Sequence, residues 1–261
     1  KGAAYVMAGL PVARGRLPTD IDILVRPSDL ATVETALRAR GWRPAKSDPY
    51  DDWYYRRHMH ELPPLRHAVR GTIMDVHHTI APPSGRLAID AGRLWAEAVP
   101  LGGRLSVPSP TTMIVHAAIH LFQNGEIGGE LCELLDGHQL LSGFGDRAGF
   151  WDDLLTRTRD LGAARPVFYM LRYAEAVFGT AVPAWVWSRL GVPASPLAVR
   201  VMDGLVPKTL VPPVRGDLSG AAARGALYLR GHWLRMPPRP LLRHLLRKSA
   251  RAAGLPSFPP A

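Results

Sequence analysis

The sequence is poor in cysteine, because Cys132 is the only one among its 261 residues. A single thiol excludes an internal disulfide, and its setting in GGELCELLDG favours a packed helix position over a reactive thiol. The chain also lacks an uninterrupted apolar stretch of the length that a membrane span needs, and no signal peptide is visible. Together these absences predict a cytoplasmic protein.

Acidic residues are absent after Asp217, and the basic residues that follow it are Arg224, Arg230, Arg235, Arg239, Arg243, Arg247, Lys248 and Arg251. The formal net charge of the chain is +10, which predicts a polyanionic partner such as a nucleotide, a nucleic acid or an anionic membrane surface. We expect a basic amphipathic helix from Pro240 to Ala253. Such a helix can make weak contacts with RNA or a membrane surface, or it can pack its apolar face and leave its charges in water.

The most informative stretch of the chain is TDIDILV, from Thr19 to Val25. Side chains alternate between the two faces of a strand, so Asp20 and Asp22 project from the same face. A third acid, Asp75, stands at a similar strand position in TIMDVHHTI. Carboxylates crowded into a dry site need a cation, and Mg²⁺ prefers oxygen ligands. The sequence therefore predicts a phosphate-handling two-metal site built on two strands.

The opening of the chain carries a family resemblance. KGAAYVMAGLPVARGRLPTDIDILV, from Lys1 to Val25, resembles the start of the uncharacterised nucleotidyltransferase family in the DNA polymerase β-like superfamily, which reads roughly L-K-G-x-A and then R-x-x-x-D-I-D-L-L-V. Asp75-Val76-His77-His78 is similar to the family's hydrophobic-Asp-x-His strand, and LWAEAVPLGGRLSVPSPTTMIVHAAIHLFQ is similar to its linker and H-x-x-x-H helix. The resemblance covers about the first 140 residues. Because the chain opens inside the motif, we expect a further helix upstream.

The resemblance implies an α+β fold, in which a small mixed sheet of the polymerase β-like nucleotidyltransferase type is followed by an α-helical domain. It also implies a metal-dependent enzyme that transfers a nucleoside monophosphate from an NTP, such as ATP, to an acceptor hydroxyl and releases pyrophosphate. Mg²⁺ or Mn²⁺ would be held by Asp20, Asp22 and Asp75, which are the expected catalytic residues. The acceptor stays open among a small metabolite, an RNA end and a protein side chain, because resemblance does not transfer to acceptor pockets.

Four further residues are expected to contact the nucleotide. Lys1 and Arg16 are candidates for the triphosphate, since phosphoryl transfer needs fixed cations besides the metals and the family spacing favours an Arg four residues before the first Asp. Gly2 allows the backbone to approach a phosphate closely. His77 shares a strand face with Asp75, so it can contact phosphate or position the acceptor.

The local patterns predict a helix over 2–8, a strand over 20–25, a helix over 29–40 capped by Ser28, and an irregular loop over 42–52. Strands are expected over 53–59, 66–69 and 72–80. A connector over 81–108 contains one short helix around 90–98. Helices then follow over 109–123, 129–141, 151–161, 165–178, 183–190, 196–206, 221–234 and 240–253. We therefore expect a nucleotidyltransferase domain with its connector over 1–108, truncated at its N-terminus, and an α-helical domain over 109–261.

Two questions stay open at the level of sequence. His116 and His120 stand four residues apart on one helix face, which suits a zinc site, a cleft that includes Asp136, or two histidines packed in a helical core. The function also has a rival from another class. A non-catalytic nucleotidyltransferase-like binding protein would keep the carboxylates and act as an RNA-binding or antitoxin-like partner through its basic end.

Overall fold

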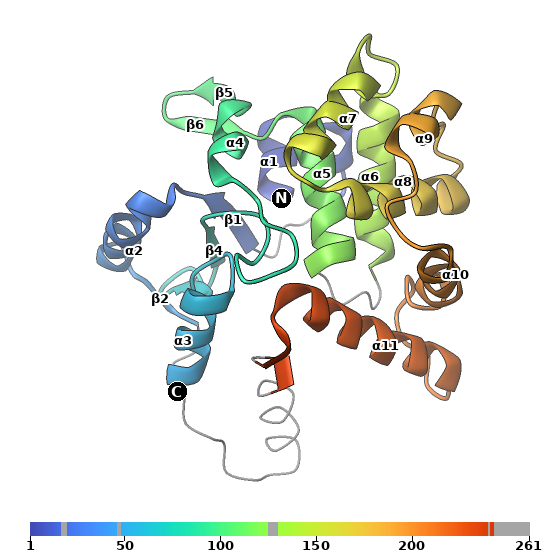
Figure 1. Cartoon of the computed structure of the whole chain (residues 1–261). Helices are drawn as coiled ribbons and strands as arrows, with labels where there is room; N and C mark the ends of the chain where they lie inside the picture. Colours follow the sequence, from blue (N-terminus) through green and yellow to red (C-terminus); the bar gives the residue numbers. More distant parts are fainter. Residues whose placement is uncertain (17–19, 46–47, 125–129, 240, 243–261) are drawn as a thin grey trace. The chain divides into compact units, whose positions relative to one another are not determined.

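A computed structural model describes residues 1–16, 20–45, 48–124, 130–239 and 241–242 (Figure 1). The chain forms two compact units, which we call the helical unit (Lys1, Ala3–Arg16 and Gly92–His232) and the sheet unit (Gly2, Leu17–Ala91 and Trp233–Ala261). The predicted domain boundary after residue 108 stays a prediction. The expected basic helix over 240–253 lies outside the described residues, apart from residues 241 and 242.

The sheet unit contains a mixed four-stranded sheet in the order β1-β4-β3-β2. Strand β1 (Asp20–Leu24) runs parallel to β4 (Ile73–His77), whereas β3 (Leu65–His67) is antiparallel both to β4 and to β2 (Trp42–Pro44). Figure 1 shows β1 and β4 side by side. The mixed sheet, followed along the chain by a helical region, confirms the predicted α+β fold.

One face of this sheet is apolar. Its core consists of Trp42, Leu62, Leu65 and Val76, with Ile23, Val25, Leu30, Val33, Leu37 and Met74 packed against it. Leu30, Val33 and Leu37 recur at helical spacing in α2 (Leu30–Ala39), so this helix covers the face with one apolar stripe. The helix ends before Gly41, whose φ of 88° favours glycine. Because strand side chains alternate, the acids of β1 and β4 are left on the opposite face.

The segment over 53–59 was wrongly predicted as a strand, because residues 53–58 belong to helix α3 (Pro49–His58) and Met59 is its C-cap. The aromatic residues of this segment favour a strand, but the helix-start and helix-end signals around it favour a helix. Asp48 caps the helix by accepting a hydrogen bond from the backbone N–H of Tyr50 at 2.8 Å, and Pro49 stands in the first turn. Acids in the first turn and bases in the last turn also complement the helix dipole. The expected loop over 42–52 likewise contains β2 and the start of α3.

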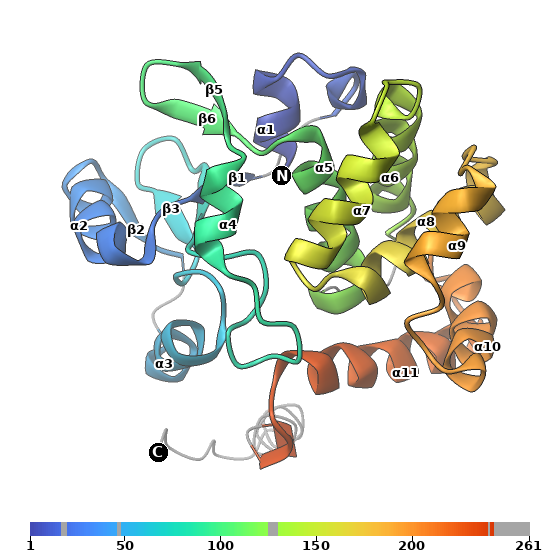
Figure 2. The ribbon, with the colours of Figure 1, turned by 45° about the horizontal axis from the view of Figure 1, so that its top comes forward.

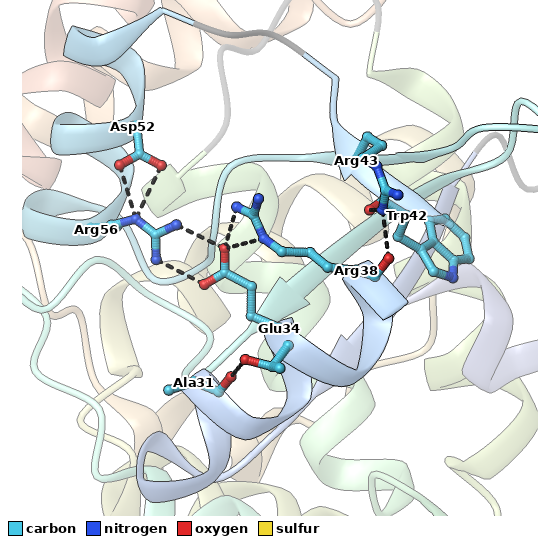
Figure 3. A network of polar contacts seen from close by, with 8 residues as sticks. Ala31, Glu34, Arg38, Trp42, Arg43, Asp52 and Arg56 are labelled. Carbon is cyan, nitrogen blue, oxygen red and sulfur yellow. Dashed lines mark hydrogen bonds and ion pairs between the residues drawn. The ribbon is translucent and has the colours of Figure 1, made fainter. Parts of the chain in front are cut away.

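Helices α2 and α3 are joined by ion pairs (Figure 3). Arg56 of α3 donates to Glu34 of α2 at 2.9 and 3.0 Å, and it also binds Asp52 one turn earlier. Arg38 donates to the same Glu34 carboxylate at 2.7 Å. These guanidinium hydrogen bonds outweigh the effect of partial burial and lower the pKa of Glu34. The shared carboxylate therefore ties the two helices together.

Two smaller expectations about this part of the chain need correction. Ser28 does not cap α2, because its hydroxyl donates to Asp29 within the short 3-10 helix η2 (Pro27–Asp29). The connector contains the expected short helix, α4 (Ala91–Ala96), and also a two-stranded hairpin that was not predicted. Its strands are β5 (Val99–Gly102) and β6 (Leu105–Val107).

The helical unit is built around α5 (Pro110–Ile119), eight of whose ten residues are buried. Ser109 caps this helix by accepting a hydrogen bond from the backbone N–H of Thr112 at 3.3 Å. Helix α5 contacts α6 (Leu131–Phe144), α7 (Phe150–Asp160) and α8 (Ala164–Phe178), which group around it in both ribbon views (Figures 1 and 2).

The remaining elements complete the list of described helices. They are α1 (Gly2–Met7), η1 (Pro11–Ala13), η3 (His120–Asn124, a π-helix), α9 (Ala184–Leu190), α10 (Pro196–Leu205), η4 (Val206–Lys208) and α11 (Leu218–Arg235). Among the described residues, every helix is too short or too polar to cross a membrane.

Candidate metal centre

Three carboxylates gather on the polar face of the sheet. Asp20 and Asp22 come from β1 and Asp75 comes from β4, where it is the register partner of Asp22. One oxygen of each carboxylate lies within 4.8 Å of the others. Strand alternation gives Asp20 and Asp22 the same face, and the parallel pairing of β1 with β4 adds Asp75. The structure therefore brings together the three acids that the sequence singled out, and we call them the acid triad.

The surroundings of Asp75 fit a cation. Its Oδ1 atom is buried and has no hydrogen-bond partner among the described residues. Burial, and then the negative charges of Asp22 and Asp20, raise the pKa of Asp75 to about 6 against the opposing effect of His77. A hard divalent ion such as Mg²⁺ or Mn²⁺ would give the buried oxygen a partner and neutralise the crowded charges. The residues present thus suit the metal that the fold implies.

His77 of β4 lies between two carboxylates. Its Nε2 atom is 3.3 Å from Oδ1 of Asp22, and its Nδ1 atom is 3.2 Å from Oε2 of Glu61. Burial alone would lower the pKa of His77, but the hydrogen bond with Asp22 and the charges of Glu61 and Asp22 raise it. Burial likewise favours a higher pKa for Asp22, yet its hydrogen bond with His77 acts the other way and the pKa is lowered. His77 and Asp22 therefore stabilise each other's charged forms.

Sequence reasoning missed two residues beside the triad, His60 and Glu61. Glu61 forms an isolated antiparallel bridge with His77, which places both on the same face. Burial first, and then the charges of Asp75 and Asp22, raise the pKa of Glu61 to about 7. The ring of His60 is buried and stacks on that of His77, with 5.2 Å between their centroids. The dense His-x-His-Glu pattern that ends in these residues was the signal available in the sequence.

Helix α3 adds a phenol near these acids. Burial, followed by the charges of Glu61 and Asp75, raises the pKa of Tyr55 to about 12. With this raised pKa, the phenol keeps its proton throughout the physiological pH range and can donate a hydrogen bond. Tyr55 therefore stays neutral in the helix that replaces the expected strand over 53–59.

The predicted triphosphate cations lie in the helical unit and are paired with acids of α6. Lys1 donates to Oε1 of Glu133 at 2.6 Å, and Arg16 donates to Asp136. Gly2 is the first residue of α1. The structure thus brings Lys1 and Arg16 next to α6, whereas the acid triad and His77 belong to the sheet unit. Their predicted role as phosphate ligands stays a prediction.

His116 of α5 and His120, the first residue of η3, lie one helical turn apart, and His120 contacts α6. The rings of His116 and His120 are 6.5 Å apart in a T-shaped arrangement, and Nδ1 of His120 is 2.8 Å from Oε2 of Glu133. Burial would raise the pKa of Glu133, but the hydrogen bond and charge of His120, together with Lys1, lower it to about 2. Among the described residues, the groups able to hold a metal do not include these two histidines. The acid that His120 meets is Glu133, while Asp136 binds Arg16.

Comparison with known proteins agrees with this geometry. The family model described as "Uncharacterised nucleotidyltransferase" matches residues 1–179, which is more than half of the chain and includes the whole acid triad. The match confirms the resemblance seen in the sequence. No curated protein and no solved structure matches the chain.

Proposed function

This chain belongs to the uncharacterised nucleotidyltransferase family, and from that membership we propose that it transfers a nucleotidyl group from an NTP to an acceptor hydroxyl. The observation that carries the proposal is the acid triad, in which Asp20, Asp22 and Asp75 offer oxygens within 4.8 Å of one another. This donor set suits Mg²⁺ or Mn²⁺. A bound divalent ion supplies charge neutralisation for the triphosphate and the leaving pyrophosphate.

The residues of the chain have distinct parts in the proposed reaction. Asp20 and Asp22 of β1 would hold the cation, and Asp75 faces them from β4. The acceptor oxygen forms a bond to the α-phosphorus while the bond to pyrophosphate breaks. The hydroxyl proton passes to the carboxylate of Asp75, which faces the two aspartates of β1 from β4. His77 orients Asp22 through their 3.3 Å contact.

Lys1, Gly2, Arg16 and His77 are the proposed contacts of the triphosphate. Fixed cations are needed because the transferred group and the leaving pyrophosphate both carry negative charge. Lys1 and Arg16 are held by Glu133 and Asp136. Binding a phosphate with either cation therefore requires that its ion pair open or that the carboxylate and the phosphate share it. Specificity for ATP among the NTPs belongs to the same proposal.

The test is incubation of the protein with each α-³²P-labelled NTP, Mg²⁺ or Mn²⁺, and cell extract. We expect a labelled product with wild-type protein and none with Asp75→Asn. Asp29→Asn is the matched control, because it makes the same chemical change at an exposed position of the sheet unit. NTP binding without labelled product or pyrophosphate release would instead favour the non-catalytic binding protein.

A further inference from the structure

A second group of metal-ligand side chains lies beside the acid triad and differs from it in chemistry. It consists of His60, Glu61 and His77, which offer two imidazoles and one carboxylate with ligand atoms within 4.8 Å of one another. We call it the His-Glu-His cluster. Two imidazole nitrogens favour transition metals, whereas the all-oxygen triad favours Mg²⁺. The two clusters are therefore expected to select different ions.

The spacing of two of these groups suits one ion. Nδ1 of His77 and Oε2 of Glu61 are 3.2 Å apart. Ligands about 2.1 Å from a tetrahedral metal ion are about 3.4 Å from each other. Glu61 and His77 are held in this position by their backbone bridge across the sheet. Little rearrangement is needed for both to reach a common ion.

The other nitrogen of His77 also fits such a site. Nε2 lies 3.3 Å from Oδ1 of Asp22. Histidine ligands usually donate their second N–H to a carboxylate, which fixes the tautomer and leaves the first nitrogen free to bind metal. Metal binding would release the proton of Nδ1, so that the proton on Nε2 stays with Asp22 and the Nδ1 lone pair is directed toward the ion beside Glu61. His60 stacks on the same ring at 5.2 Å and completes the donor set from the neighbouring chain segment.

We propose that His60, Glu61 and His77 bind a divalent transition metal ion, of the series from Fe²⁺ to Zn²⁺, at a site distinct from the acid triad. Asp22 connects the two sites, since it belongs to the triad and orients His77. The proposal does not depend on nucleotidyl transfer, because metal binding can be measured without a substrate. The competing explanation is a metal-free hydrogen-bond network in which His77 only orients Asp22.

The test is a Co²⁺ titration of untagged, metal-stripped protein in excess Mg²⁺, followed by visible absorption and calorimetry. Co²⁺ is the probe because its visible spectrum reports nitrogen ligands and geometry. We expect one equivalent to bind despite the Mg²⁺. Glu61→Gln and His77→Ala should weaken its binding about tenfold or more. His58→Ala is the matched control, since this histidine is two residues from His60 and outside the cluster; it should bind Co²⁺ as wild type does.

Three results would overturn the proposal. The first is the absence of Co²⁺ binding to wild-type protein in excess Mg²⁺. The second is binding that neither Glu61→Gln nor His77→Ala weakens. The third is binding that Asp20→Asn abolishes while Glu61→Gln leaves it intact, which would place the ion on the acid triad. Glu61→Gln preserves the size of the side chain, so the test does not depend on how the buried His60 tolerates substitution.

Discussion

Asp22 and Asp75 are register partners on the parallel strands β1 and β4. Parallel neighbours cannot be joined by a tight turn, and here the intervening chain forms α2, β2, α3 and β3 before it returns as β4. The apolar core on the opposite face fixes the register, because a slip by one residue would bury the acids and expose Ile23 and Val76. Folding of the sheet therefore brings the two carboxylates together.

Asp22→Asn is expected to remove nucleotidyl transfer and the response of the protein to Mg²⁺. Activity should fall by about a hundredfold or more, the scale typical of lost transition-state stabilisation. A ligand raises the melting temperature only of a protein that binds it, so the Mg²⁺-dependent shift should disappear. Thermal melts with and without Mg²⁺ measure this, with Asp29→Asn as control. An undiminished Mg²⁺ shift in Asp22→Asn would contradict the assignment.

Asp75→Asn is expected to stabilise the metal-free protein. The pKa of Asp75 is raised to about 6, mainly by burial, so its ionised form is less stable in the folded than in the unfolded chain. Allowing for solvent screening, the amide should raise the free energy of unfolding at pH 7.5 by about 1 to 2 kcal/mol. Urea unfolding without metal checks the sign. Asp22→Asn should show no such gain, because Asp22 interacts with His77 and its pKa is lowered.

The polar face of the sheet was only partly predictable from sequence. Strand alternation was enough to group Asp20 with Asp22 and to propose Asp75 and His77 as their neighbours. Glu61 reaches this face through a bridge to His77, which is a tertiary pairing that no local pattern encodes. The wrong prediction of a strand over 53–59 also explains why His60 and Glu61 were missed. These residues follow the end of helix α3, whereas the prediction placed them after a strand.

The partners of Lys1 and Arg16 illustrate a second limit. Their hydrogen bonds reach Glu133 and Asp136, 132 and 120 residues away along the chain. Both acids belong to α6, whose existence was predicted but whose packing was not. Helical periodicity shows which face of a helix is apolar, yet it does not identify the segment that packs against the polar positions. Ion pairs between residues so far apart in the sequence can be identified only from the three-dimensional structure.

Arg16→Ala is expected to weaken NTP binding if Arg16 contacts the triphosphate. Loss of one charge-assisted hydrogen bond should reduce affinity about tenfold. Arg14→Ala is the matched control, because Arg14 is an exposed arginine two residues earlier. Equilibrium binding of a fluorescent NTP analogue in Mg²⁺ measures both variants, and circular dichroism checks that each is folded, since Asp136 loses its partner in Arg16→Ala. Equal affinities of the two variants would mean that Arg16 does not contact the triphosphate and that its ion pair with Asp136 of α6 is structural.

Glu133→Gln is expected to destabilise the protein in a pH-dependent way. The carboxylate accepts from Lys1 at 2.6 Å and lies 2.8 Å from His120, and these contacts help lower its pKa from 4.5 to about 2. A carboxyl group with a depressed folded pKa contributes stability above its unfolded pKa and loses it as the pH falls through the folded value. The variant should therefore cost about 2 kcal/mol at pH 7.

The difference between Glu133→Gln and wild type should shrink as the pH falls from about 4.5 toward 2, because protonation removes the same charge from the wild-type protein. Urea unfolding at pH 7, 4 and 3 follows this change. Glu175→Gln on α8 is the control, since Glu175 is exposed and its substitution should leave the unfolding free energy within about 0.5 kcal/mol at each pH. A pH-independent difference for Glu133→Gln would contradict this prediction, because Gln keeps the size of the side chain and only the lost negative charge is expected to depend on pH.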